Sequence, residues 1–166
     1  MMKNYRIRKG TTEDLEFLQD MLYEAVFWST DQERIPKEDL FIVPEISKLL
    51  KDFFRRSGDY SLIATDEKEI PIGAAWYRFY TNEDHGFGFV DSSTPELGIS
   101  MVEKYRGKGI GKELMTRLLE NAKSRGIKNI SLSVDPKNHA LHLYEALGFK
   151  KVSESGTSWT LLKDLD

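Results

Sequence analysis

The residues best suited to binding a ligand form one glycine-rich segment, Tyr105 to Lys112, with the sequence YRGKGIGK. Its three glycines permit a tight backbone bend and the close approach of another group. A helical pattern begins inside the segment, so free N–H groups and the positive end of a helix dipole meet there. Lys108 and Lys112 add positive charge. We therefore predict an anion site, for which a diphosphate is the natural occupant.

Two common phosphate-binding patterns do not fit this segment. A Walker loop needs a Gly, four residues and then Gly-Lys-Ser/Thr, but Arg106 stands at the first Gly position and Glu113 replaces the hydroxyl. The dinucleotide pattern Gly-x-Gly-x-x-Gly fails because Gly107 and Gly109 are followed by Lys112. A different diphosphate and a turn shaped by packing alone remain as alternatives.

The segment lies between a predicted strand over 96–102 and a predicted helix over 109–125. The apolar residues of that helix recur on one face, as in a helix packed on a sheet: Ile110, Leu114, Leu118, Leu119 and Ala122. The pattern then predicts a strand over 130–134, a helix over 138–147 and strands over 150–152 and 159–162. Strands that alternate with helices favour a sheet covered by helices.

The first half of the chain predicts the remaining elements. A strand over 5–8 is followed by a helix from Thr11 or Thr12 to about Trp28, which Glu13 and Asp14 stabilise in its first turn. The next predictions are an irregular stretch over 29–43, a helix over 45–56, hairpin strands over 60–65 and 72–80, and a loop or hairpin tail over 85–93. We predict one domain over residues 1–166.

Composition narrows the classes of function. Lys and Arg number 24 against 27 Asp and Glu, a net charge of −3, so no basic field attracts nucleic acid or an anionic membrane. Cysteine is absent, which excludes disulfides, thiolate metal sites and a cysteine acyl intermediate. No apolar run is long enough to span a bilayer or to serve as a signal peptide. We predict a cytoplasmic protein without a nucleic-acid or membrane partner.

Two motifs together resemble the signatures of the GCN5-related N-acetyltransferases (GNAT). Arg106-x-x-Gly109-x-Gly111 resembles the family's Arg/Gln-x-x-Gly-x-Gly/Ala motif, which binds the coenzyme A (CoA) pyrophosphate. Asn138, followed by Ala-x-x-Leu-Tyr-x-x-x-Gly-Phe ending at Phe149, resembles the second signature. The likeness covers about residues 96–149 and implies the GNAT fold: an α/β (α+β) domain with a mixed, mostly antiparallel sheet of about 6–7 strands and about 4 helices.

The resemblance also implies a cofactor, acetyl-CoA, and no metal. The pantetheine arm would contact the strand residues Ile99, Ser100 and Met101, together with Asn138 and Tyr144. The pyrophosphate would be held by Arg106, Gly107, Lys108, Gly109, Ile110, Gly111 and Lys112. The sequence departs from the family at Glu103 and Lys104, where a proline is common.

The catalytic demands of acetyl transfer to an amine can be assigned to residues. An alkylammonium with a pKa of about 10.4 needs a base, for which Glu96 is the candidate and His85 the alternative. A backbone N–H near Met101 is suited to polarising the carbonyl. The resemblance implies that Tyr144 donates a proton to the departing sulfur.

Other interpretations of the same residues stay open at this point. Glu96 follows a proline at a strand edge, where an acid is usually only solvated. Tyr144 shares a helical face with apolar residues and also fits a core position. Five aromatic residues fit either the acceptor site or sheet packing: Trp28, Phe41, Trp76, Tyr77 and Phe79. His139 and His142 fit surface positions better than a metal site.

Three functions are compatible with these observations. The first is an N-acetyltransferase that moves the acetyl group of acetyl-CoA directly to a primary amine of a small molecule, an amino acid or a peptide. The second is a non-catalytic acyl-CoA-binding regulatory module, against which Tyr144 argues. The third, a domain for another nucleotide, conflicts with the failed spacings above. The family resemblance also implies a possible homodimer.

Overall fold

The computed structural model describes residues 3–166, in which seven strands form one sheet. The strands are β1 (Tyr5–Lys9), β2 (Tyr60–Asp66), β3 (Pro71–Arg78), β4 (Glu96–Met101), β5 (Asn129–Val134), β6 (Lys150–Ser155) and β7 (Ser158–Asp164). Their order across the sheet is β1-β2-β3-β4-β5-β7-β6, and all neighbours are antiparallel except β4 and β5. This confirms the predicted mixed, mostly antiparallel sheet.

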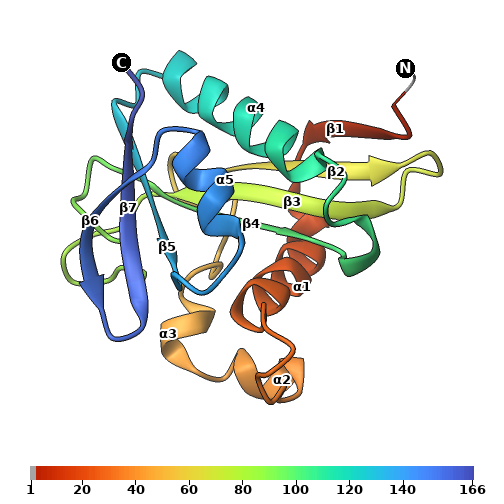
Figure 1. The fold of residues 1–166 in the computed structure, drawn as a ribbon, viewed down its shortest axis with the longest axis horizontal. Coiled ribbons are helices and arrows are strands. Elements are labelled where there is room, and N and C mark those ends of the chain that lie inside the picture. The colour runs from red at the N-terminus through yellow and green to blue at the C-terminus, as the bar shows by residue number, and fades with distance from the viewer. Residues whose placement is uncertain (1–2) are drawn as a thin grey trace.

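Helices cover both faces of the sheet (Figure 1). The chain forms α1 (Leu15–Val26), α2 (Lys37–Leu40), α3 (Pro44–Ser47), α4 (Ile110–Ser124) and α5 (Ala140–Ala146), with short 3₁₀ turns η1 (Thr12–Asp14) and η2 (Glu103–Tyr105). Helices α1 to α3 lie on one face, and α4 and α5 lie on the other (Figure 1). Among residues 3–166 no helix is long and apolar enough to cross a membrane.

The period-2 alternation of the central strands builds a separate core on each face. In β3, Ala75 and Tyr77 pack in the core beneath α4 and α5. Their neighbours Ala74 and Trp76 pack in the core beneath α1. Because every second side chain of a strand points to the same face, a strand of continuously apolar residues predicts that both faces of the sheet are covered. Helices cover both faces here.

The sheet opens between its two parallel strands. Strands β4 and β5 form a single pair, Glu96 with Ser131, and then diverge (Figure 1). At the pair, the Ser131 N–H donates to the Pro95 carbonyl at 3.0 Å. Beyond it the two strands leave a wedge, which has Glu96 at its closed end and Met101 at its open end. The order of strands thus places a gap in the middle of the sheet.

The predicted helix over 45–56 is wrong beyond its first turn. Helix α3 ends at Ser47, and Asp52 and Phe54 have positive φ angles of 55° and 79°, which interrupt any helix. The fully buried guanidinium of Arg78 takes the carbonyls of Lys48 and Lys51, at 3.3 and 2.7 Å, as hydrogen-bond acceptors. Tertiary contacts therefore overrode the apolar periodicity of this segment.

The same guanidinium forms a buried ion pair. Two nitrogens of Arg78 donate to the Asp59 carboxylate at 2.9 and 2.8 Å, and the two side chains are 0% and 1% exposed. Asp59 also accepts the Phe54 N–H at 3.0 Å, and the guanidinium lies 5.0 Å from the centre of the Phe53 ring. The irregular segment after α3 is thereby attached to β3 beside Glu96, the register partner of Arg78.

The other sequence-based boundaries agree with the structure to within a few residues. The predicted helix over 109–125 is α4, and the hairpin over 60–80 is β2 and β3. The predicted helix over 138–147 begins two residues later, at Ala140, whose N–H donates to Oδ1 of Asn138 at 3.0 Å. The segment over 29–43, predicted to be irregular, contains the four-residue helix α2. The loop over 85–93 contains no strand.

Candidate active site

The glycine-rich segment forms an open turn before α4. Gly107 and Gly109 have φ angles of 74° and 84°, a region that side chains with a Cβ rarely adopt. A Cβ added at either position would meet nothing within 4 Å. Their backbone angles therefore require glycine while the space in front of them stays open, as a site approached closely by a ligand requires.

The N–H groups of this turn are free to bind an anion. Within the described chain, none from Gly107 to Lys112 donates a well-formed hydrogen bond, and the first helical bond runs from Glu113 to the Gly109 carbonyl at 3.2 Å. Helix α4 is 15 residues long, so its dipole points at the turn. This arrangement fits the two phosphates of a pyrophosphate and supports the packing-only alternative less well.

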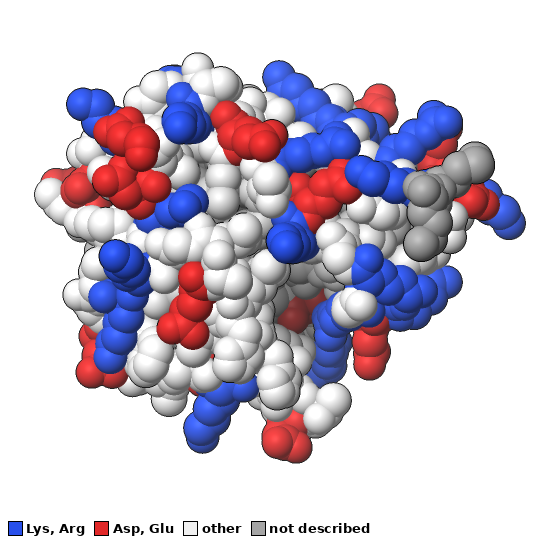
Figure 2. All heavy atoms as spheres, turned by 45° about the horizontal axis from the view of Figure 1, so that its top comes forward, with Lys and Arg blue, Asp and Glu red and all other residues white. Residues whose placement is uncertain are grey.

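Charges around the turn favour an anion as well. Glu113, the acid in the first turn of α4, is paired with Lys3 and Arg117, both at 2.7 Å, and accepts a hydrogen bond from Tyr5 at 2.7 Å. The hydrogen bond from Lys3 is the main cause that lowers the pKa of Glu113. Glu113 is therefore balanced by basic partners and does not place a free negative charge at the turn. Figure 2 shows one face of the molecule, which is hollowed near its centre, with acidic atoms inside the hollow and Lys and Arg side chains beside it.

Arg106, the first residue of the motif, braces the turn with its side chain. Its Nε donates to the Met101 carbonyl at 3.1 Å, and its Nη2 lies 3.5 Å from the Glu24 carboxylate on α1. The guanidinium thus connects the end of β4 with α1. Its position indicates a structural contribution to the turn in addition to positive charge.

The edge of β4 that faces the wedge offers unpaired backbone groups. The Val102 N–H donates to Ile72 of the β3 side at 2.8 Å, so by the alternation of a strand the Ser100 N–H also points to β3. The N–H groups of Ile99 and Met101 then point towards β5, with which they do not pair. Ile99 and Met101, rather than Ser100, therefore present their backbone N–H groups to the wedge.

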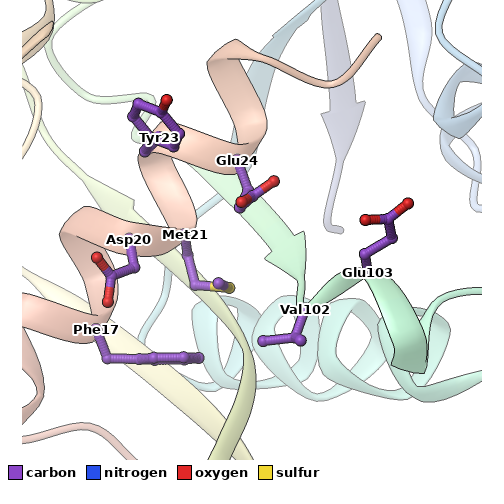
Figure 3. Close-up of a pocket in the computed structure, with 7 residues that line it drawn as sticks. All are labelled: Phe17, Asp20, Met21, Tyr23, Glu24, Val102 and Glu103. Carbon is purple, nitrogen blue, oxygen red and sulfur yellow. The ribbon is translucent and has the colours of Figure 1, made fainter. Parts of the chain in front are cut away.

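A cavity of about 330 Å³ lies next to this end of β4 (Figure 3). Its lining comes from α1 and from the turn after β4: Phe17, Asp20, Met21, Tyr23, Glu24, Val102 and Glu103. Glu24 and Glu103 extend from opposite sides of the opening, while Met21 and Val102 line it with apolar surface (Figure 3). Asp20 is paired with Lys37 and Glu24 with Arg34. The sequence did not single out these α1 residues, because their helical spacing is that of any amphipathic helix.

Glu96 occupies the closed end of the wedge beneath the loop that joins β3 to β4. Its Oε1 accepts the Gly88 N–H at 2.9 Å, whereas Oε2 is inaccessible to solvent and has no hydrogen-bond partner in residues 3–166. Burial raises the pKa of Glu96 to about 7, although the Gly88 N–H and the nearby His85 and Lys48 oppose the shift. Glu96 is therefore not simply a solvated acid at a strand edge. Its carboxyl titrates near neutral pH, as a general base requires.

Tyr144 lies on α5, on the face of the sheet opposite to Glu96. Its side chain is 8% exposed and belongs to the core beneath α4 and α5, where its ring meets Phe149 edge-on at 6.1 Å. Burial raises the pKa of its phenol to about 12. Glu96 points to the α1 face, since it is the register partner of Arg78. The candidate base and acid therefore belong to opposite faces of the split sheet.

Asn138 caps α5. Its Oδ1 accepts the Ala140 N–H at 3.0 Å, and its own N–H donates to the Asp135 carbonyl at 2.8 Å. This side-chain oxygen is thus engaged in holding the start of the helix that carries Tyr144. The predicted contact of Asn138 with pantetheine would have to use the NH2 group of its side-chain amide.

The remaining candidates divide between core and surface. Trp76 and Tyr77 are 5% and 0% exposed and pack on opposite faces of the sheet, which agrees with the sheet-packing alternative. His139 and His142 are exposed, as predicted. Among residues 3–166 no three His, Asp or Glu side chains come together as a metal site.

Comparison with known proteins gives one family and two curated relatives. A sequence model of the acetyltransferase (GNAT) family matches residues 20–149. The chain is 28% identical over 96 residues to the L-amino acid N-acyltransferase MnaT of Escherichia coli K12, covering 57% of this chain and 53% of MnaT. It is 32% identical over 74 residues to the ribosomal protein bS18-alanine N-acetyltransferase of Haemophilus influenzae, covering 43% and 51%. The chain thus spans about half the length of the curated relatives that it matches.

Solved structures share the whole fold. The PaiA N-acetyltransferase of Thermoplasma acidophilum, in complex with coenzyme A, superposes with a TM-score of 0.73 at 23% identity, over 98% of this chain and 99% of that one. A GNAT superfamily phosphinothricin acetyltransferase of Sinorhizobium meliloti, in complex with acetyl-CoA, gives 0.67 at 18% identity, over 98% and 89%. At 23% and 18% sequence identity, the similarity between these structures and this chain is a similarity of fold.

Proposed function

The chain belongs to the acetyltransferase (GNAT) family, and from this premise we propose that it transfers an acetyl group from acetyl-CoA directly to a primary amine. The observation that carries the proposal is the row of free N–H groups from Gly107 to Lys112 beside a sheet split between β4 and β5. Bound coenzyme in related folds and relatives that acylate amines support it.

The residues present fit the cofactor. The amides from Gly107 to Lys112 would hold the pyrophosphate, with Arg106 bracing their turn and Lys108 adding charge. The Ile99 N–H, which does not pair with β5, would contact the pantetheine arm, alongside Asn138 and Tyr144. When bound, acetyl-CoA supplies the activated acetyl thioester.

The chain's own residues would meet the three demands of the reaction. Glu96 removes a proton from the acceptor ammonium, since its carboxyl is half ionised near neutral pH. The Met101 N–H stabilises negative charge on the carbonyl oxygen. Tyr144 gives its proton to the departing sulfur. The phenol, with a pKa of about 12, is a weaker acid than a free thiol, with a pKa of about 8.5. The proton transfer from Tyr144 to the thiolate is therefore uphill and requires a well-oriented phenol.

The acceptor is a primary amine of a small molecule, an amino acid or a peptide. The two curated relatives act on L-amino acids and on an alanine of a ribosomal protein, so both classes belong in any test. Two of the acidic residues that line the cavity beside α1 are already in ion pairs, Asp20 with Lys37 and Glu24 with Arg34, so the cavity does not choose between these classes of amine. A cytoplasmic location and a homodimer stay predictions.

The main test measures thiol release from acetyl-CoA over a panel of amino acids, small amines and peptides. We expect release that depends on one class of amine, and acetyl-CoA should raise the melting temperature while ATP and NAD do not. A thermal shift without thiol release with any amine would favour the alternative, a non-catalytic acyl-CoA-binding module. Equal shifts with all three ligands, or none, would contradict the cofactor assignment.

Replacing Tyr144 with Phe separates chemistry from binding. Tyr144→Phe keeps the ring in its core position and removes only the hydroxyl, so kcat should fall by about a hundredfold while the Kd for acetyl-CoA stays the same. Tyr60→Phe is the matched control, because Tyr60 lies on β2 at the edge of the same core and stacks on Tyr77 rather than on α5. Unchanged turnover in Tyr144→Phe would remove this residue as the proton donor.

A further inference from the structure

An indole lies across the middle of β4, on the face of the sheet that α1 covers. Trp76 of β3 and Gly98 of β4 are register partners, and Trp76 belongs to the core beneath α1. A Cβ added to Gly98 would stand 2.5, 2.6 and 3.0 Å from Cζ2, Cε2 and Nε1 of the indole. The ring therefore occupies the space of a side chain at position 98, and only glycine leaves room for it.

The N–H edge of this indole has no partner within the described chain. Trp76 is 5% exposed, and within residues 3–166 its Nε1 donates no hydrogen bond, although this nitrogen is not sealed from solvent. Gly98 beneath the ring is itself partly exposed. An indole N–H at the border of a core usually has an acceptor. At this point of β4 a bound molecule can supply one.

The indole lies where the acceptor amine approaches the reacting groups. Glu96 and Gly98 are two residues apart on β4, point to the same face and stand about 6.6 Å apart along the strand. Gly98 also lies between Glu96 and Met101, the residues that we assign to the amine and to the acetyl carbonyl. An amine between these two groups therefore lies over Gly98, beside the indole N–H.

The chemistry of this donor selects one class of amine. An indole N–H is a donor only, so it favours an oxygen acceptor on the substrate. In an α-amino acid or a peptide N-terminus, the carbon that bears the amine also bears a carboxylate or carbonyl group. With a hydrogen bond of about 2.9 Å at each end, this nitrogen and oxygen can connect two positions about 6.6 Å apart. A lysine side chain or a simple alkylamine has no oxygen there.

We propose that Trp76 determines the acceptor class, because its indole N–H donates to the carboxylate or carbonyl oxygen next to the reacting amine. The acceptor is then an α-amine, either of a free amino acid or of a peptide N-terminus. This inference rests on the proposed function and narrows it. Trp76 orients the substrate and takes no part in the proton transfers, while Gly98 gives the indole its position.

The first test compares three amines with the unsubstituted protein by thiol release from acetyl-CoA. Alanine, alaninamide and isopropylamine share one skeleton and differ in the group beside the amine, which is a carboxylate, an amide carbonyl or a methyl. We expect kcat/KM for alanine or alaninamide to exceed that for isopropylamine at least about tenfold. A preference for alanine identifies a free amino acid as the acceptor, and a preference for alaninamide identifies a peptide N-terminus.

The second test removes the donor. Trp76→Phe keeps an aromatic ring in the core, so kcat/KM for the preferred α-amine should fall at least about tenfold, while kcat/KM for isopropylamine and the Kd for acetyl-CoA stay the same. Gly98→Ala, which displaces the indole, should have the same selective effect. Trp159→Phe is the matched control, because its indole packs against the core beneath α4 and α5, and it should keep all these values.

The outcomes separate this proposal from the proposed function. An unsubstituted protein that releases no thiol with any amine overturns the function itself. Release with isopropylamine that is as efficient as release with alanine and alaninamide overturns only the assignment of Trp76. An equal fall of kcat/KM for all three amines in Trp76→Phe assigns the indole to packing and likewise overturns the proposal. If Trp76→Phe does not fold, the comparison of the three amines decides.

Discussion

Replacement of Gly109 with Glu is expected to abolish the rise in melting temperature that acetyl-CoA produces. The new side chain would occupy the open space before α4 and place a negative charge where we propose that the pyrophosphate binds. Two unit charges about 4 Å apart repel by about 4 kcal/mol at an effective dielectric constant near 20, which corresponds to a loss of roughly a thousandfold in affinity. Titration calorimetry with acetyl-CoA measures this loss directly.

Gly126 provides the matched control for this substitution. It follows the other end of α4, has a φ angle of 82° against 84° for Gly109, and likewise has nothing within 4 Å of an added Cβ. Gly126→Glu therefore carries a similar backbone penalty without a charge at the phosphate turn. Acetyl-CoA binding should survive in Gly126→Glu. Normal binding by Gly109→Glu would show that the coenzyme lies elsewhere.

Replacement of Glu96 with Gln is expected to lower kcat by about a hundredfold to ten-thousandfold, the usual contribution of a general base. Gln keeps the shape and still accepts the Gly88 N–H, but it cannot take a proton. In the unsubstituted protein kcat/KM should rise with pH through a pKa of about 7 and then level off. Glu83→Gln, an exposed acid of the same loop, is the control. An unchanged rate and pH profile in Glu96→Gln would assign the base to another residue.

The same substitution should stabilise the fold above neutral pH. The pKa of Glu96 rises from 4.5 to about 7 on folding, so the folded state holds this proton more tightly than the unfolded state does. Stability is therefore lost as pH rises from about 4.5 to about 7, and the full cost, at most about 3 kcal/mol, is present above that range. Glu96→Gln should melt higher than the unsubstituted protein at pH 8 and show little difference at pH 4. A melting difference independent of pH would contradict the burial of this carboxyl.

Local sequence signals predicted the parts of the fold that local interactions specify. The apolar period of α4, the helix start near Thr11, and the two apolar runs of β2 and β3 all appear where the pattern placed them. The segment after α3 departs from its pattern. Its backbone carbonyls bond to Arg78, a residue about 30 positions away, and no period within the segment contains that information.

The same distinction between local and tertiary information applies to the candidate site. Residue types and spacing alone determined the glycine turn, because positive φ angles at Gly107 and Gly109 and a following amphipathic helix are local properties. Only the tertiary structure decided that the Glu96 side chain is largely covered, with Oε2 closed to solvent, because Gly86 and Gly88 of the loop between β3 and β4 lie against it. Burial depends on segments distant in sequence meeting in space, and with it the desolvation that brings this carboxyl close to neutral pH.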